Sequence, residues 1–166
     1  MPIIFFDPNC KTESKINRFG LCDDPPPNTN PAYIDENNSS KWIAIVNNPN
    51  QRTAEFYAID NCVPILRPNG EMESRCDGLL LYLNNLIFIE LKSREGGQWL
   101  KKGREQLTTT VNIFKSQNNI NNYSRVEAYV CNSRRPLAHH GQMENIQRFK
   151  DDTGLTLNGT NIIDLS

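Results

Sequence analysis

The sequence lacks both long apolar runs and any strong excess of charge. No stretch approaches the roughly 20 apolar residues needed to cross a bilayer, and the first residues, MPIIFFDPNCK, have neither the basic nor the long apolar region of a signal peptide. With 18 basic and 19 acidic residues, the net charge is −1, so the overall basic excess typical of nucleic-acid-binding proteins is missing too. We therefore expect a cytoplasmic protein without membrane contact, in which any binding of nucleic acid would need a local basic cluster.

Cysteine is scarce and shows no paired spacing. The sequence contains no Cys-x-x-Cys pair, and its cysteines number five: Cys10, Cys22, Cys62, Cys76 and Cys131. An odd number without paired spacing favours neither a disulfide framework nor a four-cysteine zinc site. We expect reduced, partly buried thiols, as in most cytoplasmic proteins.

Regular patterning is also weak in residues 1–40. Residues 3–6 (IIFF) resemble a short strand, and residues 11–19 have some helical character. The prolines of CDDPPPNTNP, which begins at Cys22, exclude a regular helix or a central strand there. We interpret residues 1–40 as a proline-rich N-terminal arm or extension and residues 41–166 as one domain, which agrees with the length of the chain.

The clearest pattern lies in residues 75–93, RCDGLLLYLNNLIFIELKS. Two short apolar runs flank Asn84-Asn85, which predicts a β-hairpin with a two-residue turn. That turn would pair Asp77 with Lys92. Since side chains alternate between the two faces of a strand, Asp77, Glu90 and Lys92 would project from one face at one end, with the carboxylates roughly 5–8 Å apart at Cβ.

The rest of the chain predicts a sheet flanked by helices. Both faces of the hairpin are apolar away from its charged end, which is typical of central strands covered on both sides. A helix with an apolar stripe is expected over residues 98–115, with a shorter helix over 143–150. These elements indicate an α/β fold with a mixed sheet and a β-rich N-terminal half. The remaining expected strands cover residues 42–46, 54–59 and 125–132, with a short extended piece over residues 63–66 and, in the tail, a turn and an edge strand.

Asp77, twelve intervening residues and then Glu90-Leu91-Lys92 lie on this hairpin, and the helix that follows carries Gln106. In this spacing and context the chain resembles the PD-(D/E)xK nuclease superfamily, which includes restriction endonucleases, RecB-like exonuclease domains and Holliday-junction resolvases. The resemblance covers about residues 54–132. It implies a restriction-endonuclease-like mixed sheet and a Mg²⁺-dependent nuclease, with Mn²⁺ as a substitute. DNA is the expected substrate, with RNA not excluded, and a homodimer or a subunit of a larger restriction or phage-defence assembly is the expected state.

The resemblance also implies roles for individual residues. Asp77 and Glu90 would ligate Mg²⁺, the carbonyl of Leu91 would complete the site, and Lys92 would position the attacking water. Gln106 matches the glutamine that RecB-like members carry on the helix after this strand. An acid from another element often supplies a further ligand in the superfamily, and the candidates here are Glu55, Glu71 and Glu73.

The chain departs from the superfamily pattern at two positions. Thr110 stands where RecB-like members usually carry a tyrosine, and Cys76 replaces the proline before the first acid. The departure at Thr110 puts membership of the RecB-like branch in question. Substitution of the proline is common in the superfamily.

General chemistry supports the same reaction. Mg²⁺ prefers oxygen ligands, usually one or two carboxylates together with water and substrate phosphate, and a lysine beside it can stabilise developing negative charge. Nearby cations would hold the nucleic-acid backbone. The candidates for that contact are Arg94, Lys101, Lys102 and Arg104, with Arg134-Arg135 across the sheet.

Simpler interpretations exist for each feature. The charged triplet would be an ordinary salt bridge in an unrelated α/β protein, or part of a catalytically idle nuclease-like fold that binds protein or nucleic acid. An acid that interrupts an apolar strand is unfavourable unless it is paired or metal-bound, and a binding module has no need of the complete set. Gln106 and the helix cations would be solvated surface, and Trp99 a packing residue or a base-stacking one. His139 and His140 would be loop surface, metal ligands or acid–base groups.

Overall fold

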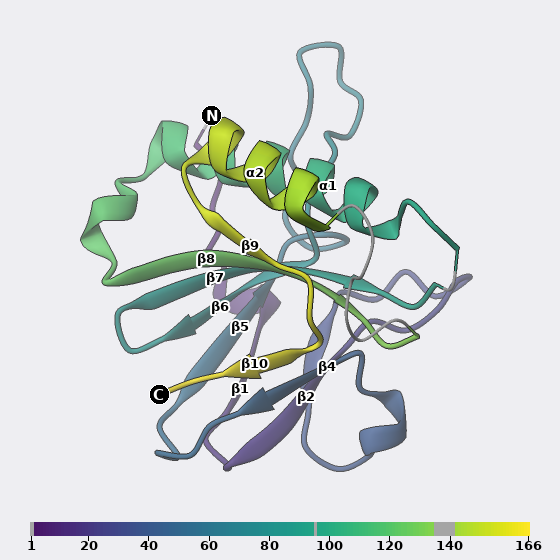
Figure 1. The fold of residues 1–166 in the computed structure, drawn as a ribbon, viewed down its shortest axis with the longest axis vertical. Coiled ribbons are helices and arrows are strands. Elements are labelled where there is room, and N and C mark those ends of the chain that lie inside the picture. Colours follow the sequence, from purple (N-terminus) through teal and green to yellow (C-terminus); the bar gives the residue numbers. More distant parts are fainter. Residues whose placement is uncertain (1, 95, 135–141) are drawn as a thin grey trace.

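The structure, a computed structural model, describes residues 2–94, 96–134 and 142–166 and contains two mixed β-sheets and two α-helices. The larger sheet has the strand order β1-β5-β6-β7-β8-β9 and the smaller one β10-β4-β2-β3. Both helices lie along one face of the larger sheet, and the smaller sheet lies on its other side (Figure 1). This arrangement confirms the α/β class with a β-rich N-terminal half. The strands are β1 (Lys11–Ser14), β2 (Arg18–Cys22), β3 (Tyr33–Asp35), β4 (Ala44–Asn47), β5 (Ala54–Ala58), β6 (Gly78–Tyr82), β7 (Asn85–Lys92), β8 (Arg125–Asn132), β9 (Thr156–Asn158) and β10 (Ile162–Asp164), and the helices are α1 (Trp99–Gln117) and α2 (Gln142–Thr153).

The predicted hairpin is present as β6 and β7, which occupy the two central positions of the larger sheet. Their apolar side chains, among them Leu80, Ile87 and Phe88, are completely buried. On the helical side, the ring of Phe88 meets that of Phe114 in α1 edge to face, with centroids 5.4 Å apart. Burial on both faces explains why the two runs lack the polar alternation of a half-exposed strand.

The register of the hairpin differs from the prediction by two residues. The turn residues are Leu83 and Asn84, and Tyr82 pairs with Asn85, so the predicted turn at Asn84-Asn85 is wrong. Asn85 instead begins β7 and pairs with Arg125 of β8, while the side-chain amide of Asn84 donates to the carbonyl of Asn122 at 3.0 Å. Contacts with the segment around β8 therefore decide the turn. A shift of two residues leaves every side chain on its predicted face, and it brings Asp77 level with Glu90.

The first forty residues belong to both sheets. Residues 11–19, expected to have helical character, instead contribute β1 and the start of β2, and no strand forms at residues 3–6. β1 pairs with β5, and β2 pairs with β3 and β4. Phe19 and Leu21 of β2 are completely buried, and Phe5 is nearly so. Residues 1–40 are therefore part of both sheets and of the buried core, and do not form the predicted N-terminal arm.

The elements after the hairpin agree closely with the prediction. The first helix and the strand over residues 125–132 are present, and the second helix extends beyond the predicted residues 143–150 to end at Thr153. β8 pairs in parallel with β7, and β9 follows at the edge of the same sheet. The tail also adds β10 to the smaller sheet, beside β4. Within the described residues, no helix combines the length and apolar character needed to cross a bilayer.

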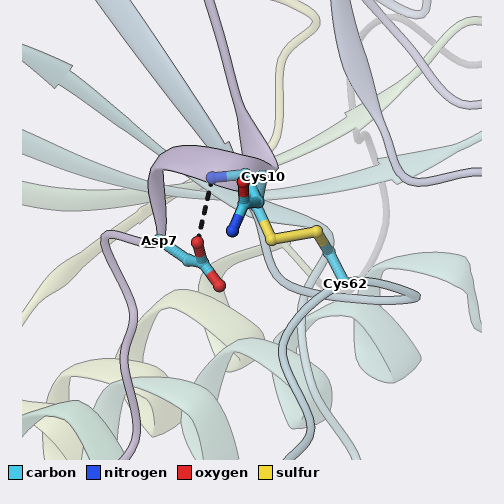
Figure 2. Close-up of a disulfide and its surroundings, with 4 residues drawn as sticks. Asp7, Cys10 and Cys62 are labelled. Carbon is cyan, nitrogen blue, oxygen red and sulfur yellow. Dashed lines mark hydrogen bonds between the residues drawn. A yellow bond between two sulfur atoms is a disulfide. The ribbon is translucent and has the colours of Figure 1, made fainter.

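A disulfide joins Cys10 to Cys62, so the expectation of reduced thiols is wrong for these two residues. Figure 2 shows the bond linking the short helical turn η1 (Pro8–Cys10) to the loop that follows β5. The two cysteines are 52 residues apart in sequence, and only the pairing of β1 with β5 brings them together. The other three are free and buried, as expected: Cys22, Cys76 and Cys131.

Candidate active site

Two buried carboxyl groups meet where β6 begins and β7 ends. Asp77 immediately precedes β6, and Glu90 lies near the end of β7, with exposed fractions of only 5% and 3%. The backbone N–H of Asp77 donates to Glu90 Oε1 at 3.1 Å, and the N–H of Leu91 donates to Asp77 Oδ2 at 2.7 Å. Antiparallel pairing thus places the predicted acidic pair at one point, with each side chain bound to the other residue's strand.

Lys92 and Gln106 complete the group. The ammonium of Lys92 lies 3.0 Å from Glu90 Oε2 and donates to Gln106 Oε1 at 2.7 Å. The lysine side chain is only 10% exposed. Since an ammonium carries three donors, one remains for a further acceptor. The structure therefore brings together all four residues that the sequence predicted for the catalytic set.

The acids outnumber the cations at this point. Burial, reinforced by the carboxylate of Glu90 and then by Asp23, raises the pKa of Asp77 well above its ordinary value. Burial also raises the pKa of Glu90 to about 7, with Lys92 opposing the shift and Asp60 adding to it. Low-dielectric surroundings and like charges both disfavour the ionised form. A bound cation would relieve this imbalance.

Asp23 and Asp60 are acidic neighbours that the sequence reasoning missed. Asp23 directly follows β2 and is half-buried; burial and the nearby Asp60 raise its pKa to about 6. Asp60 follows Ile59, whose N–H donates to the carbonyl of Asp77 at 2.8 Å. The pairing of β5 with β6 could have indicated Asp60, because the end of one antiparallel strand lies beside the start of the next. Nothing in the local pattern indicates Asp23.

The three glutamates considered as further metal ligands are engaged elsewhere. Glu55 pairs with Lys11 at 3.1 Å, and Glu73 pairs with Arg67 at 3.2 Å. Glu71 is exposed and also lies near Arg67, at 3.6 Å. The structure therefore does not support any of the three as a ligand beside Asp77.

The donor set at the site fits a hard divalent cation that keeps part of its water shell. Asp77 Oδ2 accepts the N–H of Leu91 at 2.7 Å, and Glu90 Oε1 accepts the N–H of Asp77 at 3.1 Å. Among the described residues, no group of three or more His, Cys, Asp or Glu side chains is arranged to hold a metal ion. Mg²⁺ commonly uses one or two carboxylates plus waters, so Asp77 and Glu90 would suffice. The role of the Leu91 carbonyl stays a prediction.

The predicted basic cluster is only partly present on the surface. Arg94, Lys101 and Lys102 are exposed, on the loop after β7 and on the first turn of α1. Arg104 is only 5% exposed and donates from Nε to Asn145 Oδ1 of α2 at 2.8 Å. The prediction that Arg104 belongs to an exposed cluster is therefore wrong, because its guanidinium lies between the two helices.

Three further residues have structural positions that bear on the site. The buried side chain of Asn132 accepts from the N–H of Arg94 and donates to its carbonyl, so it holds the loop after Lys92. Thr110 Oγ1 accepts the N–H of Cys76 at 2.8 Å. Trp99 is 8% exposed, in agreement with a packing role. Residues 135–141, which include Arg135 and both histidines, lie outside the described residues.

Comparisons with known proteins identified no relative of this chain. No family model, curated protein or solved structure matches the chain.

Proposed function

We propose that this protein is a metal-dependent nuclease of the PD-(D/E)xK type that hydrolyses phosphodiester bonds in DNA. The observation that supports the proposal is the meeting of Asp77, Glu90, Lys92 and Gln106 at one end of the central hairpin. Two buried carboxyl groups with one nearby ammonium form an arrangement that a divalent cation would balance. Such a site matches phosphodiester hydrolysis better than it matches a structural salt bridge, which would need one carboxylate.

Each side chain has a distinct part in this chemistry. Asp77 and Glu90 would hold Mg²⁺ or Mn²⁺, which, when bound, stabilises charge on the phosphate and acidifies a water. The third donor of Lys92 would orient the attacking water or stabilise charge on it. Gln106 keeps the ammonium beside Glu90. The exposed Arg94, Lys101 and Lys102 would contact the phosphate backbone and make binding sensitive to salt.

The proposal is tested by cleavage assays on plasmid, single-stranded DNA and RNA, each with Mg²⁺, Mn²⁺ or EDTA. We expect metal-dependent cleavage of DNA, reduced by roughly 100-fold or more in Lys92→Ala and Asp77→Ala, because each removes part of the charge stabilisation. Glu71→Gln is the matched control, since it neutralises an exposed carboxylate away from the site.

Cleavage that persists in both site variants would show that another site or a contaminant is responsible. An inactive wild type that also fails to bind Mn²⁺ by calorimetry would refute the proposed function. An inactive wild type that still binds DNA would instead support the catalytically idle binding module.

A further inference from the structure

We propose that Asp60 and Arg75 act as a positioning pair that sets the side-chain amide of Gln106 and, through it, the ammonium of Lys92. The effect of this pair on catalysis rests on the proposed function, whereas the contacts that define the pair do not depend on that function. Neither residue belongs to the group formed by Asp77, Glu90, Lys92 and Gln106. Their positioning effect on Gln106 runs through the short segment of residues 75–77, which carries Asp77.

The segment of residues 75–77 is held by hydrogen bonds from several elements. The N–H of Cys76 donates to Thr110 Oγ1 in α1 at 2.8 Å, and the carbonyl of Asp77 accepts the N–H of Ile59 at 2.8 Å. The carbonyl of Arg75 accepts from Gln106 Nε2 at 3.4 Å. This last hydrogen bond is long and therefore weak. A small displacement of the Arg75 carbonyl would therefore break it.

The orientation of Gln106 depends on that carbonyl. A glutamine amide presents an acceptor on one side and donors on the other. The Arg75 carbonyl takes the NH₂ group, which turns Oε1 toward Lys92 at 2.7 Å. An amide turned the other way would present donors to an ammonium, which is also a donor. Displacement of the Arg75 carbonyl would therefore release Lys92 from the helix.

Asp60 holds Arg75 from the other side. Arg75 NH2 lies 2.8 Å from Asp60 Oδ1, and NH1 donates to the carbonyl of Glu73 at 2.7 Å. The arginine side chain is 13% exposed, and its Nε has no partner among the described residues. Loss of Asp60 would leave a largely buried guanidinium with a single acceptor, which is unfavourable. We expect the guanidinium to move, and residues 75–77 with it.

The turn that carries Asp60 is rigid enough for this task. The N–H groups of Cys62 and Val63 both donate to the carbonyl of Ile59, at 3.1 and 2.8 Å. The disulfide from Cys62 to Cys10 joins the same turn to η1 (Figure 2). The remainder of the loop between β5 and β6 extends away from the body (Figure 1). Asp60 thus lies on the anchored base of the loop, and positioning by a rigid element is what such a site needs.

The first test measures the accessibility of Lys92 and needs no catalytic activity. Wild type, Asp60→Ala, Asp60→Asn and the control Glu71→Ala are treated with a limiting amine-acylating reagent, and modification at each lysine is followed by mass spectrometry. We expect Asp60→Ala to raise the rate at Lys92 several-fold relative to Lys150, which is exposed on α2. Asp60→Asn retains an acceptor and should lie between Asp60→Ala and wild type, while Glu71→Ala should match wild type.

The second test measures DNA cleavage. Asp60→Ala is expected to lower kcat by about tenfold with little change in KM, because outer-shell partners typically contribute 10–100-fold. Partial recovery in Asp60→Asn would match the lysine data.

Folded variants with a wild-type rate at Lys92 would overturn the proposal. An equal rise at Lys92 and Lys150 would also overturn it, because it would indicate general loosening. If Asp60→Ala does not fold, Asp60→Asn decides by the same ratio. A wild type without nuclease activity would refute the proposed function and leave the lysine ratio to decide the positioning role.

Discussion

At the scale of single residues, the acids of the site combine burial with a shortage of positive charge. The pKa of Glu90 is raised to about 7 from an ordinary value of 4.5, so the folded protein keeps a proton that the unfolded chain has already lost. Without metal, the contribution of this group to stability is largest below about pH 4.5 and is lost as the pH rises toward 7. Asp77 and Asp23 shift in the same direction.

The pH dependence yields a test of Glu90. We expect the melting temperature of the metal-free wild type to fall between about pH 5 and pH 7, and that of Glu90→Gln to fall less, because the amide does not titrate. Mn²⁺ affinity of the wild type should rise over the same range, because ligation needs the deprotonated carboxylate, and Glu90→Gln should bind the ion weakly. Thermal unfolding and calorimetry measure both effects.

The matched control for this experiment is Glu71→Gln. Its carboxylate is exposed and paired with Arg67, so its pH profile should follow that of the wild type. A Glu90→Gln variant with the wild-type profile would show that Glu90 is not the source of the pH dependence.

At the scale of elements, the position of α1 depends on a glycine. A Cβ added at Gly103 would lie 2.7 Å from Cγ1 of Val130 on β8, closer than packed carbon atoms come. The helix therefore approaches the sheet at this point only because the side chain is absent. Gln106 lies one turn further along, so the same contact sets its distance from Lys92.

Gly103→Ala is expected to lower the free energy of unfolding by up to about 2 kcal/mol. The clash of an overpacked contact, about 1–3 kcal/mol, outweighs the gain of about 1 kcal/mol in helix propensity. Chemical denaturation measures the change. Gly97→Ala is the control, since nothing lies within 4 Å of its added Cβ. Equal or greater stability of Gly103→Ala would show that α1 can withdraw from β8 without loss.

The disulfide also acts between elements, because it ties η1 to the loop after β5. Replacing both Cys10 and Cys62 by serine is expected to reduce stability by about 2–4 kcal/mol, since the cross-link restricts the unfolded chain. Urea unfolding of the oxidised wild type and of the double variant measures the loss, and a dithiol reductant should bring the wild type to the level of the variant. If the oxidised wild type, the reduced wild type and the double variant all unfold at the same urea concentration, the disulfide does not stabilise the fold.

At the scale of the whole molecule, the N-terminal strands join the two sheets into one body. β1 lies in the larger sheet, and β2 and β3 lie in the smaller one. The N–H of Ile34 in β3 donates to Thr12 Oγ1 of β1 at 2.9 Å. Phe19 contributes a completely buried ring. The core is therefore shared between residues 1–40 and the remainder.

A chain that begins at residue 41 is expected not to fold, because it would lose three strands and half of the disulfide. Circular dichroism should show no cooperative unfolding transition for it. Thr29→Ala, in the exposed loop between β2 and β3, should keep the wild-type transition. A cooperative transition in the truncated chain would support an independent domain over residues 41–166.

The sequence by itself determined the hairpin, α1, β8 and the convergence of Asp77, Glu90 and Lys92. Their periodicities are local, and alternation along a strand fixes the face of each side chain without knowledge of the partner strand. Only the tertiary structure decided the turn at Leu83-Asn84, the disulfide and the neighbours Asp23 and Asp60. These features depend on β8, on the pairing of β1 with β5 and on the end of β2. Segments far apart in the chain meet there, and contacts of that kind leave no periodic signal in a single sequence.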